Sequence, residues 1–491
     1  MKKPFSQQSI GWGLILSLLL QSCAVTSGSY GPLQSGSIST QAPTNVPLDL
    51  PPTRQAFAPG ELVDYIAQTG DTLPALAAHF NTTIEEIRAA NPIIPDDATT
   101  MPPGMPMKMP IYYLPLWGTS YKILPDSHFI YGPISLKLDH SKVIQSAPGW
   151  LSTYHEPRPE GNLNAADVIT QVSEHFSVSP MVLTIFLETI GEGLSNPRQP
   201  ETDYIFGYKD QANQGVYMQM VWLANTLNNG YYGWRSGQLK EFEFPDGHLE
   251  RPDPWQNAAT VAIQYALSKI VSYDEYQRLV NKGGIGETYA QYFGDPWSSD
   301  VPHIEGSLHQ PALQLPFGPG AIWNYTGGPH TGWGEGEPLS AIDFAPSGVK
   351  SCSVSTDWVT SVADGKIIRS QNGEVELDLD GDGKEQTGWV VFYLHISNID
   401  RVKLGTIVKT GDRIGHPSCE GGTSTGTHVH ITRKYNGEWI LADSALPFDL
   451  DGWVVKNGTR IYQGTLVKGT RIVTASAKAE GFSAIEAENG K

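Results

Sequence analysis

The sequence predicts a multidomain α+β protein: a small βααβ module, an all-helical middle domain and an antiparallel β-rich C-terminal domain. Its 491 residues exceed what one hydrophobic core usually serves. Between about residues 163 and 293, apolar residues recur with helical periodicity. Beyond residue 311, β-branched runs alternate with turn pairs such as Asp364-Gly365, a pattern that is typical of antiparallel strands.

The charge balance excludes one class of partner. The chain has 33 Lys and Arg against 51 Asp and Glu, a formal net charge of −18. The resulting negative field repels phosphate backbones, so we expect no nucleic-acid partner.

The first 22 residues are organised like a secretory signal. Lys2 and Lys3 precede an apolar run over residues 10–20 that is too short to span a bilayer. The run ends in Leu20-Gln21-Ser22-Cys23, which resembles the lipobox of bacterial lipoproteins. The resemblance implies lipidation at Cys23 and an extracytoplasmic location in which only the lipid contacts the membrane. An ordinary cleaved signal is the alternative.

Residues 23–61 are rich in Ser, Thr, Pro, Gly and Gln, and we expect a flexible linker because such a segment buries little apolar surface. Apart from Cys23, the chain has two cysteines, Cys352 and Cys419. Disulfides persist in exported proteins, so we predict that these two are bonded; two unrelated thiols are the alternative.

Residues 62–111 predict a short strand, two short helices and a second strand. Strands are expected over 63–67 and 107–111 and the first helix over 74–80. Thr82 and Glu85 have the spacing of a capping box for the second helix, which Asn91-Pro92 closes.

This segment, YIAQTGDTLPALAAHFNTTIEEIRAANP followed by PPGMPMKMPI, resembles the LysM domain. LysM domains bind glycans that contain N-acetylglucosamine, in a groove between the loop after the first strand and the loop after the second helix. The resemblance therefore implies peptidoglycan as a partner. It implies glycan-binding residues in two loops, namely Gly70, Asp71, Thr72, Asn91, Pro92 and Ile93.

After a connecting segment over residues 112–160, we expect a helical domain over 161–310. The stretch AADVITQVSEHFSVSPMVLTIFLETIGEG weakly resembles the start of lytic transglycosylases and lysozyme-like domains, in which a helix ends in a catalytic Glu followed by Ser-Gly. That Glu-Ser-Gly is missing here, although Glu188 and Glu192 lie near its place. We therefore favour a non-catalytic helical domain; a glycan lyase using one of these carboxylates is the alternative.

Five of the thirteen histidines fall between His330 and His430, which suggests a metal site. Within Thr427-His428-Val429-His430, alternate strand positions would set both imidazoles on one face. A single His-x-His also occurs by chance on solvated strands. Its weight comes from two further motifs, Ser340-Ala341-Ile342-Asp343 and Phe392-Tyr393-Leu394-His395.

In this order, the motifs resemble the lysostaphin-type zinc peptidases, and we assign residues 311–477 to such a domain. The resemblance implies Asp343 and His430 as zinc ligands and His395 and His428 as the catalytic pair. His330 would be the third ligand. The family usually has His-x-x-x-Asp, so the residues between His330 and Asp343 would have to loop out, and three glycines there make such a loop accessible: Gly332, Gly334 and Gly336.

The chemistry explains these residue types. A catalytic zinc commonly keeps three protein ligands and an open position, where bound water ionises near neutral pH. The catalytic histidines would orient that water, move its proton or stabilise the oxyanion.

A second acidic motif starts at Asp378 and includes Asp380 and Asp382, matching the first half of an EF-hand loop. Position twelve is Trp389 rather than Glu, so we interpret the run as a solvated acidic turn. Residues 478–491 are expected to be a tail.

Taken together, the motifs predict a lipid-anchored zinc metalloendopeptidase that cleaves peptide bonds of peptidoglycan. The rival is a non-catalytic wall-binding lipoprotein or amidase activator with a degenerate peptidase domain. The presence of Asp343, His395, His428 and His430 favours the enzyme. The sequence identifies no regulatory protein partner.

Overall fold

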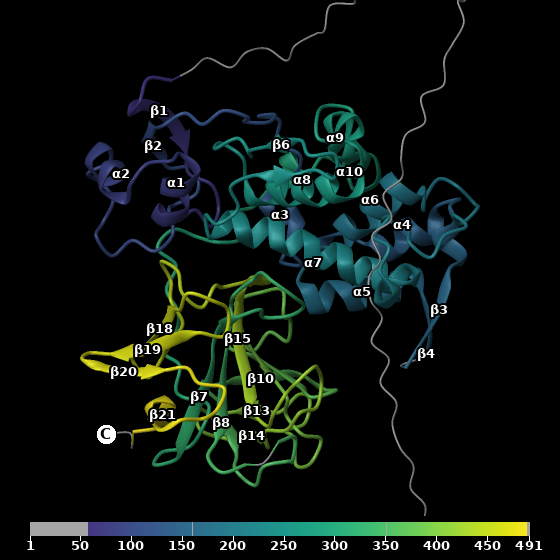
Figure 1. The fold of residues 1–491 in the computed structure, drawn as a ribbon. Helices are drawn as coiled ribbons and strands as arrows, with labels where there is room; N and C mark the ends of the chain where they lie inside the picture. Colours follow the sequence, from purple (N-terminus) through teal and green to yellow (C-terminus); the bar gives the residue numbers. More distant parts are fainter. Residues whose placement is uncertain (1–56, 160, 350, 489–491) are drawn as a thin grey trace, which may run out of the picture. The chain divides into compact units, whose positions relative to one another are not determined.

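The computed structural model describes residues 57–159, 161–349 and 351–488. The predicted signal, Cys23 and the linker up to residue 56 lie outside these residues. Among the helices of the described ranges, none has both the length and the apolarity that a membrane crossing needs. From Ala56 onward the chain packs as one unit (Figure 1).

The N-terminal module has the predicted βααβ order. Its elements are β1 Glu61–Ile66, α1 Leu73–His79, α2 Ile84–Ala90 and β2 Pro106–Ile111, with β1 and β2 paired antiparallel. The capping box of α2 is formed by Thr83 and Glu86, so the expected pair of Thr82 and Glu85 is wrong by one residue. Because Thr83 is the N-cap, Glu86 stands at the third helical position, where its side chain reaches back to the cap N–H.

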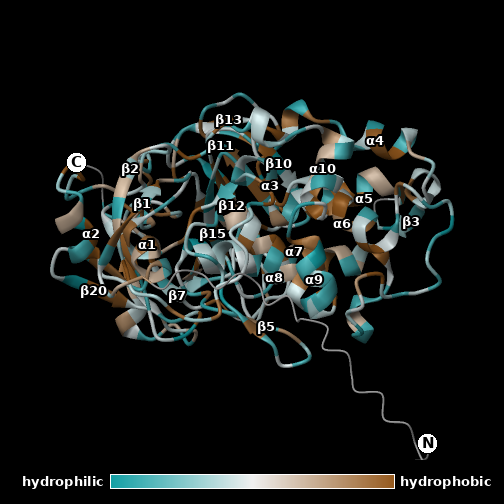
Figure 2. Cartoon of the chain, turned by 90° about the horizontal axis from the view of Figure 1, so that it is seen from above, coloured by the Kyte–Doolittle hydropathy of each residue, from teal (hydrophilic) through white to brown (hydrophobic). Residues whose placement is uncertain are grey.

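The middle of the chain is helical, as predicted. Its helices are α3 Asp126–Phe129, α4 His140–Ser146, α5 Ala165–Phe176, α6 Pro180–Gly191, α7 Gly215–Arg235, α8 Ala258–Ile270, α9 Tyr273–Leu279 and α10 Ile285–Phe293. Two small hairpins pair β3 His155–Arg158 with β4 Gly161–Asn164, and β5 Phe242–Glu243 with β6 Leu249–Glu250. The α6 helix is buried over its first eight residues and is largely brown in Figure 2.

Residues 112–160 do more than connect two modules. They contain α3 and α4, and their apolar side chains, among them Phe129, Ile144 and Trp150, belong to the same buried core as α5 to α8. Helices α3 and α4 have only four and seven residues, which is too short for a helical repeat to stand out in the sequence.

The C-terminal domain is an antiparallel β domain, as predicted. Its main sheet has nine strands in the order β13-β10-β11-β12-β15-β8-β7-β21, with β16 beside β15. These strands are β7 Ile322–His330, β8 Ala341–Pro346, β10 Gly365–Gln371, β11 Glu374–Asp378, β12 Trp389–Leu394, β13 Ile407–Val408, β15 Val429–Tyr435, β16 Glu438–Trp439 and β21 Ala484–Glu486.

Two smaller sheets complete the domain. One pairs β9 Val359–Thr360 with β14 Arg413–Gly415, and the other contains β17 Asp449–Leu450, β18 Trp453–Asn457, β19 Gly464–Lys468 and β20 Arg471–Thr474. The expected tail instead supplies β21, which pairs antiparallel with β7 because Ile485 buries its side chain in the β core. The predicted disulfide between Cys352 and Cys419 is present, with 5.2 Å between the Cα atoms.

One face of the main sheet packs against the helices. Phe392 and Leu394 of β12 and Trp439 of β16 belong to the helical core rather than to the β core. Leu394 pairs with His430 across the sheet, so this is the face on which His430 stands.

Candidate metal centre

Three predicted ligands meet where β7, β8 and β15 lie side by side. His330 ends β7, Asp343 is central in β8 and His430 is the second residue of β15. Nε2 of His330 lies 3.0 Å from Nδ1 of His430 and 3.3 Å from Oδ1 of Asp343, and that oxygen lies 3.5 Å from Nδ1 of His430. All three side chains are buried.

The strand register explains how His330 reaches this site despite its long spacing from Asp343. His430 is directly opposite Asp343, while the β7 residue opposite Asp343 is Gly327. An irregularity between Gly327 and His330 shifts the register, so that His330 pairs with Ala341. Gly327 is required there, because a Cβ would lie 2.3 Å from Oδ2 of Asp343.

The residues between β7 and β8 loop out, as the glycines suggest. Gly334 and Gly336 have φ angles of 85° and 82°, a conformation that glycine adopts without strain. Helix α7 holds this loop: Oδ1 of Asn225 accepts a hydrogen bond from the N–H of Glu335, and Oδ1 of Asn229 accepts one from the N–H of Glu337.

The arrangement fits a zinc ion. Oδ1 of Asp343 is buried and has no hydrogen-bond partner among the described residues. Zinc bound tetrahedrally to N or O ligands at about 2.0–2.1 Å would hold those atoms about 3.3 Å apart. The three separations of 3.0, 3.3 and 3.5 Å bracket that value. The donor set of two imidazoles and one carboxylate is one that zinc prefers, and no fourth protein ligand fills the remaining position among the described residues.

Backbone carbonyls fix the imidazoles. Nδ1 of His330 lies 2.8 Å from the carbonyl oxygen of Gly328, and Nε2 of His430 lies 3.1 Å from that of Gly332. Each carbonyl can only accept, so these nitrogens carry the proton, and the lone pair of the other ring nitrogen points to Asp343.

Charges inside the cluster shift the pKa values. Burial would raise the pKa of Asp343, but the neighbouring His330, His428 and His430 bring it well below its ordinary value. Burial lowers the pKa of His330, yet the Asp343 carboxylate outweighs it and the net shift is upward. Burial and its histidine neighbours lower the pKa of His395 to about 3. The carboxylate is therefore ionised and His395 is neutral at neutral pH.

The predicted catalytic pair lies beside the ligands. Nε2 of His428 is 3.6 Å from Oδ1 of Asp343, and the rings of His395 and His428 have centroids 4.5 Å apart. Both rings use Nδ1 toward a backbone carbonyl, of Glu420 and Gly426, which leaves Nε2 of each available. His395 has a φ of 67°, a left-handed conformation that costs energy in a non-glycine residue and often marks a functional site.

Three residues that support the site could not be found from the motifs. Tyr462, in the turn between β18 and β19, stacks on His330 with ring centroids 4.3 Å apart. Asn225 and Asn229 belong to the helical domain, one helical turn apart. Tyr462 lies beyond the matched motifs, and asparagines on a helix give no signal in a single sequence.

The predicted glycan-binding residues lie in two different environments. Gly70 packs against the guanidinium of Arg235, so that a Cβ there would lie 2.6 Å from it, and Asp71 is buried, accepting hydrogen bonds from Tyr65 and Gln68. Thr72 caps α1. In the second loop, Asn91 is buried and bonded to the main chain of Lys108, whereas Pro92 and Ile93 are exposed.

The other carboxylates singled out from the sequence have local partners. Glu188 accepts hydrogen bonds from the N–H groups of Leu194 and Ser195 and from Tyr292, and the exposed Glu192 accepts one from Asn196. In the acidic run, both oxygens of the buried Asp378 accept main-chain hydrogen bonds from its own turn, whereas Asp380 and Asp382 are exposed; the solvated turn remains an interpretation.

Three families match the chain. LasA, N-terminal domain, matches residues 122–306, Peptidase family M23 matches residues 346–441, and LysM domain matches residues 65–110. The M23 match includes His395, His428 and His430 and begins beyond His330 and Asp343. For the middle domain, the resemblance to lytic transglycosylases remains a prediction.

Individual relatives agree with these families. The beta-lytic metalloendopeptidase of Lysobacter enzymogenes is 33% identical over 135 residues, covering 26% of this chain and 71% of that protein. Protease LasA of Pseudomonas aeruginosa is 24% identical over 291 residues, covering 56% of this chain and 66% of that protein. A solved structure of the M23 metalloprotease pseudoalterin from the deep sea is 26% identical, with a TM-score of 0.29, covering 34% of this chain and 96% of its own. The chain spans between 34% and 71% of the length of the curated relatives that it matches.

Proposed function

This chain belongs to peptidase family M23, and from that premise we propose that it is a zinc-dependent metalloendopeptidase that hydrolyses peptide bonds of peptidoglycan. The observation that carries the proposal is the unpaired, buried Oδ1 of Asp343, which faces Nε2 of His330 and Nδ1 of His430. Relatives named beta-lytic metalloendopeptidase support the peptidase activity.

His330, Asp343 and His430 would hold the zinc through Nε2, Oδ1 and Nδ1. When bound, zinc polarises the scissile carbonyl and lowers the pKa of a water molecule. The carbonyls of Gly328 and Gly332 keep the two ligand rings in the tautomer that this binding needs.

His395 and His428 would handle the proton. Nε2 of either ring can accept the proton of the attacking water and return it to the leaving amine, or donate to the oxyanion once protonated. The carbonyls of Glu420 and Gly426 keep both rings oriented. Nε2 of His428 lies 3.6 Å from Oδ1 of Asp343, beside the predicted ligands.

The substrate follows from the module order. The LysM domain would bring the enzyme to the glycan of peptidoglycan, and its predicted contacts are the two loops at Gly70 to Thr72 and at Asn91 to Ile93. We also propose lipidation at Cys23, which would keep the enzyme in the cell envelope outside the cytoplasm. The linker between Cys23 and the LysM domain would then let this domain contact peptidoglycan at a distance from the membrane.

Incubating the zinc-loaded full chain with purified cell walls tests the activity. We expect new amino termini in the soluble products, and none from a His428→Ala variant that still binds zinc. Zinc bound at one ion per chain without any cleavage would favour the rival, a wall-binding protein without activity. His330→Ala and His430→Ala, measured for zinc content, test whether these two residues are ligands.

A further inference from the structure

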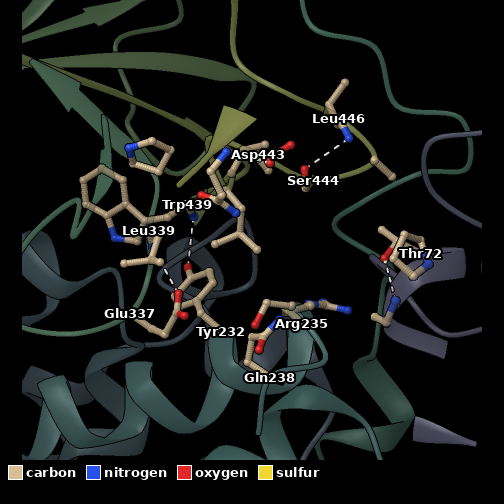
Figure 3. Close-up of a pocket in the computed structure, with 18 of the residues that line it drawn as sticks. Thr72, Tyr232, Arg235, Gln238, Glu337, Leu339, Trp439, Asp443, Ser444 and Leu446 are labelled. Atoms are coloured by element: carbon tan, nitrogen blue, oxygen red, sulfur yellow. Dashed lines mark hydrogen bonds between the residues drawn. The ribbon is translucent and has the colours of Figure 1, made fainter. Parts of the chain in front are cut away.

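A cavity separate from the metal site opens where all three modules meet. It has a volume of about 600 Å³, within the range of small-molecule sites. Figure 3 shows Tyr232 and Arg235 of α7 and Gln238, which follows the end of α7, on one side, Thr72 of the LysM domain on another, and Asp443 and Ser444 of the β domain across from α7. The β domain supplies most of the lining, and the LysM and helical domains supply the rest.

The lining has uncommitted groups that both donate and accept hydrogen bonds. Gln238 and Asn457 are among the lining residues; both are exposed, and neither side-chain amide bonds to another residue in the described part of the chain. Trp439 also lines it, and its buried indole N–H has no acceptor among the described residues. A ligand with hydroxyl and amide groups would satisfy such groups.

Most of the charged groups deep in the cavity are paired. Glu337 accepts only the N–H of Leu339, and burial raises its pKa, which favours the uncharged acid, while Arg460 is an exposed part of the lining. The guanidinium of Arg235 bonds to Glu438 and Asp126, and the Asp443 carboxylate accepts from Lys456 and from the N–H of Asn457. Because these charges are compensated, the deep part of the cavity favours a neutral polar ligand over an ion.

The position of the lining residues in the fold indicates which neutral ligand the cavity would bind. Gly70 and Thr72 come from a loop that the sequence predicts to bind glycans. On the other side, Pro329 and Ile461 line the cavity and are the sequence neighbours of His330 and of Tyr462, which stacks on His330. A sugar in the cavity would thus lie between the LysM loop and the strand that carries a predicted zinc ligand.

We propose that this cavity is a composite subsite for an N-acetylated sugar of the glycan strand, held jointly by the LysM loop, the end of α7 and the β domain. The proposal deepens the proposed function and rests on it for the identity of the polymer. It differs from the groove between the two LysM loops, because the exposed Ile93 of the second loop is not part of the cavity lining.

Titration calorimetry of the full chain with N,N′-diacetylchitobiose tests the subsite. We expect Gln238→Ala and Asn457→Ala each to weaken binding about threefold to tenfold, the usual effect of one lost hydrogen bond. Ala445→Trp fills the cavity and should remove the binding that depends on Gln238 and Asn457, leaving at most the binding of the LysM groove. Matched controls at exposed positions outside the cavity, Gln291→Ala and Ala212→Trp, should bind like the wild type.

Wild-type affinity in all three cavity variants, with loss in Ile93→Glu, would place the sugar in the LysM groove alone and overturn the proposal. Binding of trialanine but not of the disaccharide would overturn it too, since the cavity would then hold peptide. If Ala445→Trp does not fold, as judged by its melting temperature, the two alanine variants decide. The disaccharide has no peptide bond, so binding without any wall cleavage would refute the proposed peptidase activity and leave the subsite intact.

Discussion

Two buried polar clusters of this chain differ in how completely their atoms are paired. At the metal centre, Oδ1 of Asp343 has no hydrogen-bond partner among the described residues. Where the three modules meet, both oxygens of Asp126 and of Glu438 are bonded. The Arg235 guanidinium joins the two carboxylates and also donates to the carbonyl of Thr69 in the LysM domain.

The difference separates a candidate metal site from a cluster whose charges pair with one another. An unpaired buried carboxylate oxygen is costly unless something else binds it. Asp126 and Glu438, by contrast, have no carboxylate oxygen without a hydrogen-bond partner. In the Arg235 cluster, burial would raise the pKa of Glu438, but Arg235 and His303 bring it to about 2, so that it remains ionised. Removing a residue from each cluster should therefore have opposite consequences.

The largest expected effect is at the metal centre. In His430→Ala we expect the zinc content to fall below one ion per chain. Wall cleavage should fall by more than the roughly 100-fold typical of residues that merely support a ligand. The melting temperature of the zinc-free protein should change little. His155→Ala, at an exposed histidine, is the control for both assays. Full zinc content in His430→Ala would remove that residue from the ligand set.

The reverse pattern is expected for Arg235→Met. Glu438 and Asp126 would be left as uncompensated buried charges, which costs about 3–5 kcal/mol. Denaturant unfolding should show this loss, while the zinc content stays at the wild-type value. Arg278→Met breaks an exposed ion pair with Glu275 and should cost no more than about 1 kcal/mol. Equal losses in the two variants would contradict the role assigned to Arg235.

The stability of the contact between the LysM domain and helix α7 should depend on pH through His79. His79 of α1 stacks on Trp234 of α7, and burial lowers its pKa to about 3. Below pH 6.5 the unfolded chain takes up the proton and the folded chain does not, so stability is lost as the pH falls. Between pH 6.5 and 5, the wild type should lose roughly 2 kcal/mol more than His79→Gln. His155→Gln should follow the wild type in the same denaturant titration.

The smallest effect should come from the contact between helix α7 and the loop that connects β7 to β8. Asn229→Ala leaves the N–H of Glu337 without its partner, which is worth about 1 kcal/mol. Because the loop leads from His330 to Asp343, we expect zinc to be released about threefold to tenfold faster to a chelator. Gln291→Ala is the matched control. An unchanged release rate would mean that the strands alone hold the ligands in place.

The sequence predicted the features that depend on residues close together in the chain. The βααβ order, the antiparallel strands and the bonded Cys352 and Cys419 follow from periodicity, turns and cysteine number. The meeting of Asp343 and His430 depends on register, which the alternation along each strand already constrains.

Contacts between distant segments were beyond the sequence. Nothing near Arg235 shows that it will be buried with Glu438, two hundred residues away in the chain. The irregularity in β7 that sets His330 in place of Gly327 is invisible too, because a bulge leaves no fixed pattern. The shift of the α2 capping box by one residue has a simpler cause, since Thr82 and Thr83 are adjacent and either could cap.

The pairing of β21 with β7 also sets an order of assembly. The strand that carries His330 is completed on its outer side by residues 484–486, which leave the ribosome and any export channel long after β7 does. Until then residues 322–324 at the start of β7 lack their outer partner, whereas Gly328 and Pro329, beside His330, bond to the main chain of Tyr462. A nascent chain would thus complete the end of β7 that carries His330 before the opposite end, and the predicted metal site would not have to wait for β21.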